Sequence, residues 1–202
     1  MKNFNFRKLC LFLTVLLLLS TFFFGCDSQD YPQDQYRVYY EIFVRSFYDS
    51  NGDGIGDLKG VTQKLDYLED LGIDGIWLMP IMPSPTYHKY DVTDYYDIDP
   101  QYGNLEDFDE LIKAADKKGI KIIIDLVINH SSNRHPWFES AVDALWKGED
   151  SKYIDYYNFT EENPGEGFNK ITDKYYYECR FVSEMPDLNL DNSDVRSEIL
   201  DI

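Results

Sequence analysis

The sequence predicts an α/β fold in which helices cover a parallel sheet. Two observations favour it: apolar runs typical of strands alternate with segments of helical periodicity, and the alternation occurs twice within residues 37–128. Parallel strands joined by a crossover helix form right-handed βαβ units. The hydrophobic fraction of 44% is sufficient for a packed core in a chain of 202 residues.

The first unit begins with RVYYEIFV at residues 37–44, which is rich in β-branched and aromatic side chains and therefore predicts a strand. Asp57 is placed to cap a following helix, and Gly72 is placed to end it. The short apolar run of residues 74–79 stops at a proline and predicts a second, buried strand. Between them, apolar residues recur at helical spacing: Leu58, Val61, Leu65, Leu68 and Leu71.

The second unit repeats this plan, with a helix capped by Asn104 and ended near Gly119, and a third strand over residues 120–128. The helix is indicated by Leu105, Phe108, Leu111, Ile112 and Ala115. Residues 129–190 then lack clear periodicity, and loops beyond about 15 residues are uncommon within a domain. We interpret residues 129–190 as an inserted domain with an aromatic core, and residues 191–202 as the start of a third helix.

The N-terminus predicts an export signal over residues 1–25, because Lys2, Arg7 and Lys8 precede an apolar run without acidic residues. The run is short for a membrane span, which needs about 20 apolar residues. It ends at a glycine followed by Cys26, which resembles the site where bacterial lipoproteins are cleaved and acylated. A lipid on Cys26 would place the protein on the extracellular face of the membrane, with residues 26–36 as a polar tether. The alternative is ordinary cleavage and secretion.

Charge and cysteine content limit the classes of partner. Removal of residues 1–25 leaves 16 basic against 37 acidic residues, a net charge of −21. Nucleic acid is therefore excluded as an expected partner, because phosphate binding requires clustered basic side chains. Cys10 lies in the predicted signal and Cys26 at the predicted lipid site, so Cys179 has no partner for a disulfide.

The segment from Asp49 to Asp57 predicts a calcium-binding loop. Oxygen-bearing groups occur at alternate positions, in the order Asp49, Asn51, Asp53, the backbone carbonyl of Ile55, and Asp57. Hard Ca²⁺ prefers such oxygen ligands. The flanking strand and helix, and a glycine where an EF-hand carries glutamate, exclude an EF-hand. The alternative is a polar loop held by its own side-chain turns.

The predicted third strand delivers Asp125, Asn129 and His130 at or near its C-terminal end. In a barrel of parallel strands, this end carries the active site. Taken alone, a histidine after a strand is more often a structural hydrogen-bond partner than a catalytic group.

Four segments, in this order, resemble the α-amylase family of retaining α-glucan hydrolases and transglycosylases. They are GIDGIWLMPI (72–81), YHKYDVTDYYDIDPQYG (87–103), DLVINH (125–130) and MPDLN (185–189). The resemblance implies a partial (β/α)8 TIM barrel: residues 37–128 form its first part, and the insertion after the third strand is domain B. Eight strands are required to close such a barrel, so we expect the chain to be an N-terminal fragment.

The resemblance also implies roles for individual residues. Tyr90 is expected to stack on the glucose at the cleavage subsite, while His88 and His130 hydrogen-bond its hydroxyls. Asp125 is expected to order the site. Asn129 and Asp187 match ligands of a possible second calcium ion between barrel and insertion.

The resemblance predicts an extracellular α-amylase that hydrolyses α-1,4-glucosidic bonds of starch or maltodextrin with retention. The carboxylate nucleophile and the general acid are expected beyond Ile202, because no GFRxD-like segment occurs. The fragment alone is therefore expected to be inactive. Three alternatives remain open: an α-glucosidase or neopullulanase-like member of the family, a non-catalytic lipid-anchored glucan-binding protein, and a calcium-stabilised structural module.

Overall fold

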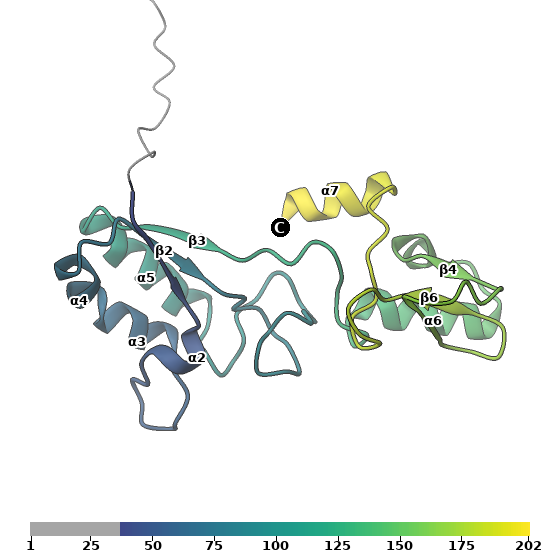
Figure 1. The fold of residues 1–202 in the computed structure, drawn as a ribbon, viewed down its shortest axis with the longest axis horizontal. Helices are drawn as coiled ribbons and strands as arrows, with labels where there is room; N and C mark the ends of the chain where they lie inside the picture. Colours follow the sequence, from purple (N-terminus) through teal and green to yellow (C-terminus); the bar gives the residue numbers. More distant parts are fainter. Residues whose placement is uncertain (1–36) are drawn as a thin grey trace, which may run out of the picture. The chain divides into compact units, whose positions relative to one another are not determined.

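Three parallel strands form the first sheet of the computed structural model, which describes residues 37–202. They are β1 (Tyr39–Ile42), β2 (Gly75–Leu78) and β3 (Lys121–Ile124), hydrogen-bonded in that order. Figure 1 shows α3, α4 and α5 on the same side of this sheet. The predicted signal, Cys26 and the tether over 26–36 lie outside the described residues.

The predicted first strand is shorter than its apolar run. β1 ends at Ile42, and a short helix, α2 (Val44–Phe47), follows it. The prediction of strand up to residue 44 was wrong, because Val44 packs into the core from a helical turn instead of extending the ladder. Composition could not distinguish the two, since both conformations bury the same side chain.

The predicted helix after Asp57 forms as two shorter helices, α3 (Leu58–Gln63) and α4 (Leu65–Asp70). The prediction of one helix was wrong at Lys64, whose φ of −100° and ψ of 6° interrupt the regular ladder. The predicted cap is confirmed, because Oδ1 of Asp57 accepts a 2.6 Å hydrogen bond from the Gly60 amide. The apolar stripe is continuous across the break: Leu58, Val61, Leu65 and Leu68 are all buried.

The second predicted helix is confirmed as α5 (Leu105–Lys117), which packs against α3. Asn104 caps it by accepting from the amide of Asp107 at 3.0 Å. Leu111 and Ala115 are buried, and Gly119 beyond the helix has a φ of +71°. Helix and strand therefore alternate as predicted, giving the arrangement of the first units of a (β/α)8 barrel.

The third strand is also shorter than predicted, since β3 ends at Ile124 rather than near residue 128. Its last ladder contact is the amide of Asp125, which donates to the Leu78 carbonyl at 2.9 Å. β2 ends at Leu78, two residues before a proline, so the chain beyond Asp125 has no strand to pair with on that side. Its functional residues therefore lie on irregular backbone.

Residues 129–190 contain a second, antiparallel sheet of β4 (Phe159–Thr160), β6 (Tyr176–Glu178) and β5 (Phe168–Lys170), in that order. They also contain α6 (Pro136–Lys147) and the 3₁₀ helix η1 (Lys152–Tyr156). Five aromatic side chains are buried, namely Trp137, Phe138, Tyr156, Tyr157 and Tyr177. The aromatic core expected for this segment is therefore present, although Trp146 is exposed.

The chain then passes into α7 (Ser193–Asp201), which Asn192 caps through the Asp194 amide. Within residues 37–202, no helix is long and apolar enough to cross a membrane. In the same range, β3 pairs only with β2.

Candidate functional site

The loop after β2 meets the end of β3 through two side chains. The Tyr90 hydroxyl donates a 2.6 Å hydrogen bond to Oδ2 of Asp125. Burial, followed by this hydrogen bond, raises the pKa of Tyr90 to about 12. The phenol therefore stays protonated at neutral pH, and its ring orientation is fixed by a carboxylate on the neighbouring strand end.

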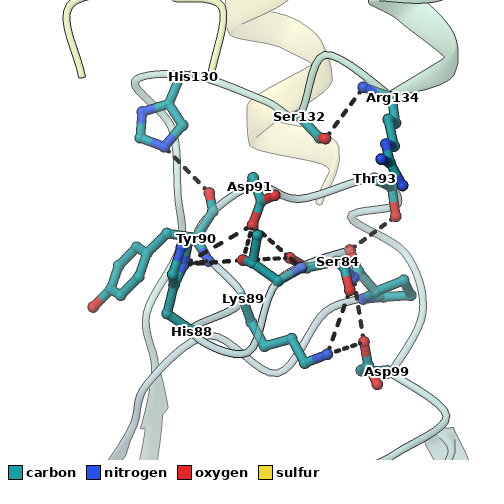
Figure 2. Close-up of polar contacts among 12 residues, drawn as sticks. Ser84, His88, Lys89, Tyr90, Asp91, Thr93, Asp99, His130, Ser132 and Arg134 are labelled. Atoms are coloured by element: carbon teal, nitrogen blue, oxygen red, sulfur yellow. Dashed lines mark hydrogen bonds and ion pairs between the residues drawn. The ribbon is translucent and has the colours of Figure 1, made fainter. Parts of the chain in front are cut away.

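Two histidines hold the backbone of Tyr90 from opposite sides. The Tyr90 amide donates to Nδ1 of His88 at 3.1 Å, and Nε2 of His130 lies 3.2 Å from the Tyr90 carbonyl oxygen. Figure 2 shows the His130 contact and the position of His88 beside Tyr90. A neutral imidazole has one donor and one acceptor nitrogen. Nδ1 of His88 accepts from the Tyr90 amide, so the hydrogen of His88 is on Nε2. Nε2 of His130 faces a carbonyl oxygen, so the hydrogen of His130 is also on Nε2.

The two histidines differ in what they can offer a ligand. His130 is only 4% exposed, and burial lowers its pKa. Its Nε2–H is directed at Tyr90, and its Nδ1 lies 3.3 Å from Nδ2 of Asn129. The side chain of His88 is 30% exposed, and its Nδ1 takes the internal contacts. The Nε2–H of His88 is therefore the histidine donor that remains for a bound molecule.

A buried carboxylate orders the start of the same loop. Asp91 is 1% exposed, and its Oδ1 accepts from Oγ of Ser84 at 2.7 Å and from Oγ1 of Thr86. Thr86 in turn lies 3.2 Å from Nδ1 of His88. Since the Thr86 hydrogen is donated to Asp91, the backbone amide of Tyr90 supplies the hydrogen bond to His88.

Tyr95 connects the loop after β2 with the segment that leaves β3. Its hydroxyl lies 2.9 Å from both the Val127 and the His130 carbonyl oxygens. Beside it, the Ser132 amide donates to the Val92 carbonyl at 2.8 Å. These contacts fix the backbone of His130, and hence its distance from Tyr90.

The predicted calcium loop is closed by hydrogen bonds of its own. The Asp49 carboxylate accepts from the amides of Asn51, Gly52 and Gly54, and the last two bonds, which measure 2.7 Å, contribute most to lowering its pKa. Asn51 accepts from the Asp53 amide. These are side-chain turns of the kind that also hold polar loops without an ion.

The donor set of this loop suits a hard cation, but its carboxylates are not gathered around one point. Asp53 accepts from the Ile55 amide at 2.8 Å, and Asp57 is occupied by Gly60 and Ser50. Across residues 37–202, no three His, Cys, Asp or Glu side chains are close enough together to hold a metal ion. Calcium at this loop, with Asp49, Asn51, Asp53, Ile55 and Asp57 as its ligands, therefore stays a prediction.

The pair predicted for a second calcium ion is brought together. Nδ2 of Asn129 lies 3.3 Å from Oδ1 of Asp187, and burial raises the pKa of that carboxyl. Oδ1 of Asp187 is also 3.3 Å from the Arg180 amide. In this orientation the Asn129 amide presents nitrogen to its partner, so binding of an ion requires the amide to turn.

Sequence reasoning missed three residues that organise the site, namely Asp91, Tyr95 and Lys89. Lys89 is 2% exposed and lies between the two residues that were predicted. A lysine and an aspartate in a polar segment normally indicate solvent-exposed surface, so the sequence carried no signal of their burial. Their burial follows from the packing of the folded loop, which the sequence pattern does not show.

The three parallel strands have the arrangement of the first part of a βα-barrel, and the predicted site side chains meet beyond the carboxyl ends of β2 and β3, which is where barrels of this kind carry their sites. The protein-family model of the alpha-amylase catalytic domain matches residues 41–202 of this chain. The chain belongs to the alpha-amylase family, and the resemblance carried by its four motifs is confirmed.

Similar proteins include several specificities. Alpha-amylase 3 of Dictyoglomus thermophilum is 48% identical over 200 residues, covering 98% of this chain and 38% of the relative. The oligo-1,6-glucosidase of Parageobacillus thermoglucosidasius is 41% identical over 180 residues, covering 82% of this chain and 31% of the relative. Among solved structures, Eubacterium rectale Amy13B superposes with a TM-score of 0.79 at 58% identity, covering 83% of this chain and 34% of that one. The chain thus spans less than two fifths of these proteins.

Proposed function

We propose that the protein containing this chain hydrolyses α-1,4-glucosidic bonds of starch or maltodextrin. The observation that carries the proposal is the pairing of Tyr90 with His88 at the strand ends. Their rings lie 6.0 Å apart, with the Tyr90 phenol held by Asp125 and the His88 Nδ1 held by the Tyr90 amide. The alpha-amylases among its relatives support the same reading.

In this proposal, Tyr90 and His88 bind the glucose unit at the point of cleavage. The flat face of Tyr90 stacks on the apolar face of the sugar, and the Nε2–H of His88 donates to a hydroxyl. A hydroxyl contact can strengthen as the ring flattens toward an oxocarbenium-like transition state. Contact between His130 and the sugar stays a prediction, while its bond to the Tyr90 carbonyl supports a role in holding that residue.

Bond cleavage with retention requires two carboxyl groups about 5 Å apart, one as nucleophile and one as acid. We expect both groups outside the residues of this chain. Within the chain, Asp125 binds the Tyr90 phenol and Asp91 binds two hydroxyls of its own loop, so both serve to order the site.

Three further features belong to the proposal and rest on the sequence. Ca²⁺ binds the loop from Asp49 to Asp57 and, with less donor support, Asn129 and Asp187. Cys26 carries a lipid that anchors the protein on the extracellular face of the membrane, or else the protein is secreted. Replacement of Cys26 by alanine, followed by labelling with a fatty-acid analogue, separates these two routes: only the wild type is labelled if the anchor exists.

A second candidate is an exo-acting α-glucosidase or an α-1,6-glucosidase. It is favoured by relatives named oligo-1,6-glucosidase, which are 41% to 43% identical to this chain. Because the site residues contact only one glucose unit, they do not select among neighbouring linkages.

The deciding experiment incubates the complete protein with maltoheptaose and with isomaltose, and identifies products by chromatography and the initial anomer by NMR. We expect maltoheptaose to give shorter maltooligosaccharides in the α-configuration, with isomaltose intact. Glucose and maltohexaose as the only early products of maltoheptaose support an exo-acting α-glucosidase, and release of glucose from isomaltose supports an α-1,6-glucosidase. A β-configured first product contradicts the retaining mechanism.

A further inference from the structure

Lys89 has a backbone conformation that lysine rarely adopts. Its φ is +66°, and within residues 37–202 it is the only residue other than glycine with a positive φ. The left-handed region brings the β-carbon of an L-residue close to the backbone, so it persists only where the surroundings impose it. This turn lies between His88 and Tyr90, and allows the Tyr90 amide to point back at His88 Nδ1.

The side chain of Lys89 makes three polar contacts outside its own turn. Its ammonium lies 2.7 Å from Oδ2 of Asp99, 3.1 Å from Oε1 of Gln101 and 3.4 Å from the Ser84 carbonyl oxygen. An ammonium has three hydrogens, and these three acceptors satisfy all of them. Figure 2 shows the side chain extending from the Tyr90 loop to Asp99 and Ser84.

The partners of the ammonium are themselves fixed to the fold. The Asp99 amide donates to the Ile81 carbonyl just beyond β2, and the Asp99 carboxylate accepts from the amides of Ser84 and Gln101. The Lys89 and Asp99 side chains are 2% and 6% exposed, so water does not screen their attraction. The ion pair therefore connects the turn at Lys89 to the end of the buried strand.

We propose that Lys89 is a positioning residue for glucose binding: its buried ion pair with Asp99 holds a left-handed turn that sets the orientation of Tyr90. The inference rests on the proposed function, since Lys89 acts through a residue assigned there to the sugar. Lys89 itself is turned away from the sugar, toward Asp99.

The test is a double-mutant cycle in the complete protein, with kcat and KM measured on maltoheptaose. Lys89→Met keeps the apolar stem and removes the charge, and Tyr90→Ala removes the ring. We expect Lys89→Met alone to lower kcat/KM about tenfold, mainly through kcat, and to change it less than about twofold when Tyr90 is already alanine. Losses that multiply overturn the inference, because Lys89 would then act independently of Tyr90.

Two further variants keep the test decisive. Lys89→Gln retains a donor toward Asp99 and replaces Lys89→Met in the cycle if the methionine protein does not fold. Lys113→Met removes an exposed lysine paired with Asp109 and should leave both kinetic constants unchanged. If Tyr90→Ala has no effect in the wild-type background, the proposed function fails and the inference falls with it. If Tyr90→Ala is impaired but uncoupled from Lys89, only the inference fails.

Discussion

The phenol oxygen of Tyr90 and Oδ2 of Asp125 lie 2.6 Å apart, and this hydrogen bond joins the loop after β2 to the residue after β3. The two residues are 35 positions apart in sequence. The Asp125 amide donates to the Leu78 carbonyl, so the backbone that carries the Asp125 carboxylate is fixed to β2. The ring of Tyr90 is thereby held by the sheet rather than by its own loop alone.

We expect the ring and the hydroxyl of Tyr90 to contribute separately to activity. Tyr90→Ala removes the stacking surface and should lower kcat/KM on maltoheptaose at least tenfold. Tyr90→Phe keeps the ring and loses only the bond to Asp125 that orients it, so it should lower kcat/KM only several-fold. Steady-state kinetics of the two variants measure both effects. Equal rates for wild type and Tyr90→Ala would refute the stacking role.

Chelation is expected to destabilise the protein if calcium holds the loop from Asp49 to Asp57. A metal that binds only the folded state at a concentration 100-fold above its Kd adds about 2.7 kcal/mol of stability. EDTA should therefore lower the melting temperature of the wild type measured by calorimetry. Asp53→Ala should melt below the wild type in calcium and should lose less than the wild type when EDTA is added. A wild type that is indifferent to EDTA removes the metal assignment.

The cap of α5 offers a test of the fold that is separate from the site. Asn104 accepts from the Asp107 amide at 3.0 Å. Asn104→Ala should lower the free energy of unfolding by about 1 kcal/mol, and Asn104→Gly by only a few tenths, because glycine leaves the cap position open to water. Urea unfolding monitored by circular dichroism distinguishes them. Equal losses for alanine and glycine contradict a capping role.

His135 is expected to make stability depend on pH. The residue is 4% exposed, its Nδ1 accepts from the Trp137 amide at 3.2 Å, and burial lowers its pKa to about 4. The unfolded chain, with a histidine pKa near about 6.5, binds more protons than the folded one between these values. The contribution, at most about 3 kcal/mol, is therefore complete above pH 6.5 and is lost as the pH falls toward 4.

The matched variant for this prediction is His135→Asn, which keeps an acceptor for the Trp137 amide and cannot be protonated in this range. Unfolding free energies of the two proteins, measured from pH 7.5 to 4.5, should converge as the pH falls. Parallel profiles would show that the buried imidazole does not control the pH dependence.

Local sequence pattern predicted the elements better than their ends. Asp57 and Asn104 were identified as caps because capping depends on contacts within three residues. The break at Lys64 and the early end of β3 at Ile124 depend on packing and on where β2 stops, and neither leaves a mark on the apolar periodicity. Strand pairing is a long-range property, so the end of a strand cannot be predicted from a run of isoleucines and valines alone.

In the candidate site, too, some residues could be predicted from the sequence and others could not. Motif resemblance identified Tyr90, His88 and Asp125, which the fold brings together. It could not show that His130 donates to the Tyr90 carbonyl, because that contact joins segments 40 residues apart. The left-handed Lys89 was even less accessible, since lysine favours exposed positions and ordinary backbone angles. The residue types of Tyr90 and His88 suggest ligand binding in the sequence itself, whereas the supporting role proposed for Lys89 depends on its position in the folded loop.

The hydroxyl of Tyr95 has a single hydrogen, yet it lies 2.9 Å from two carbonyl oxygens, those of Val127 and His130. Both carbonyls therefore share one donor. One side-chain atom therefore makes two of the contacts that hold the passage from the sheet into residues 129–190, and Tyr95→Phe would remove both at once.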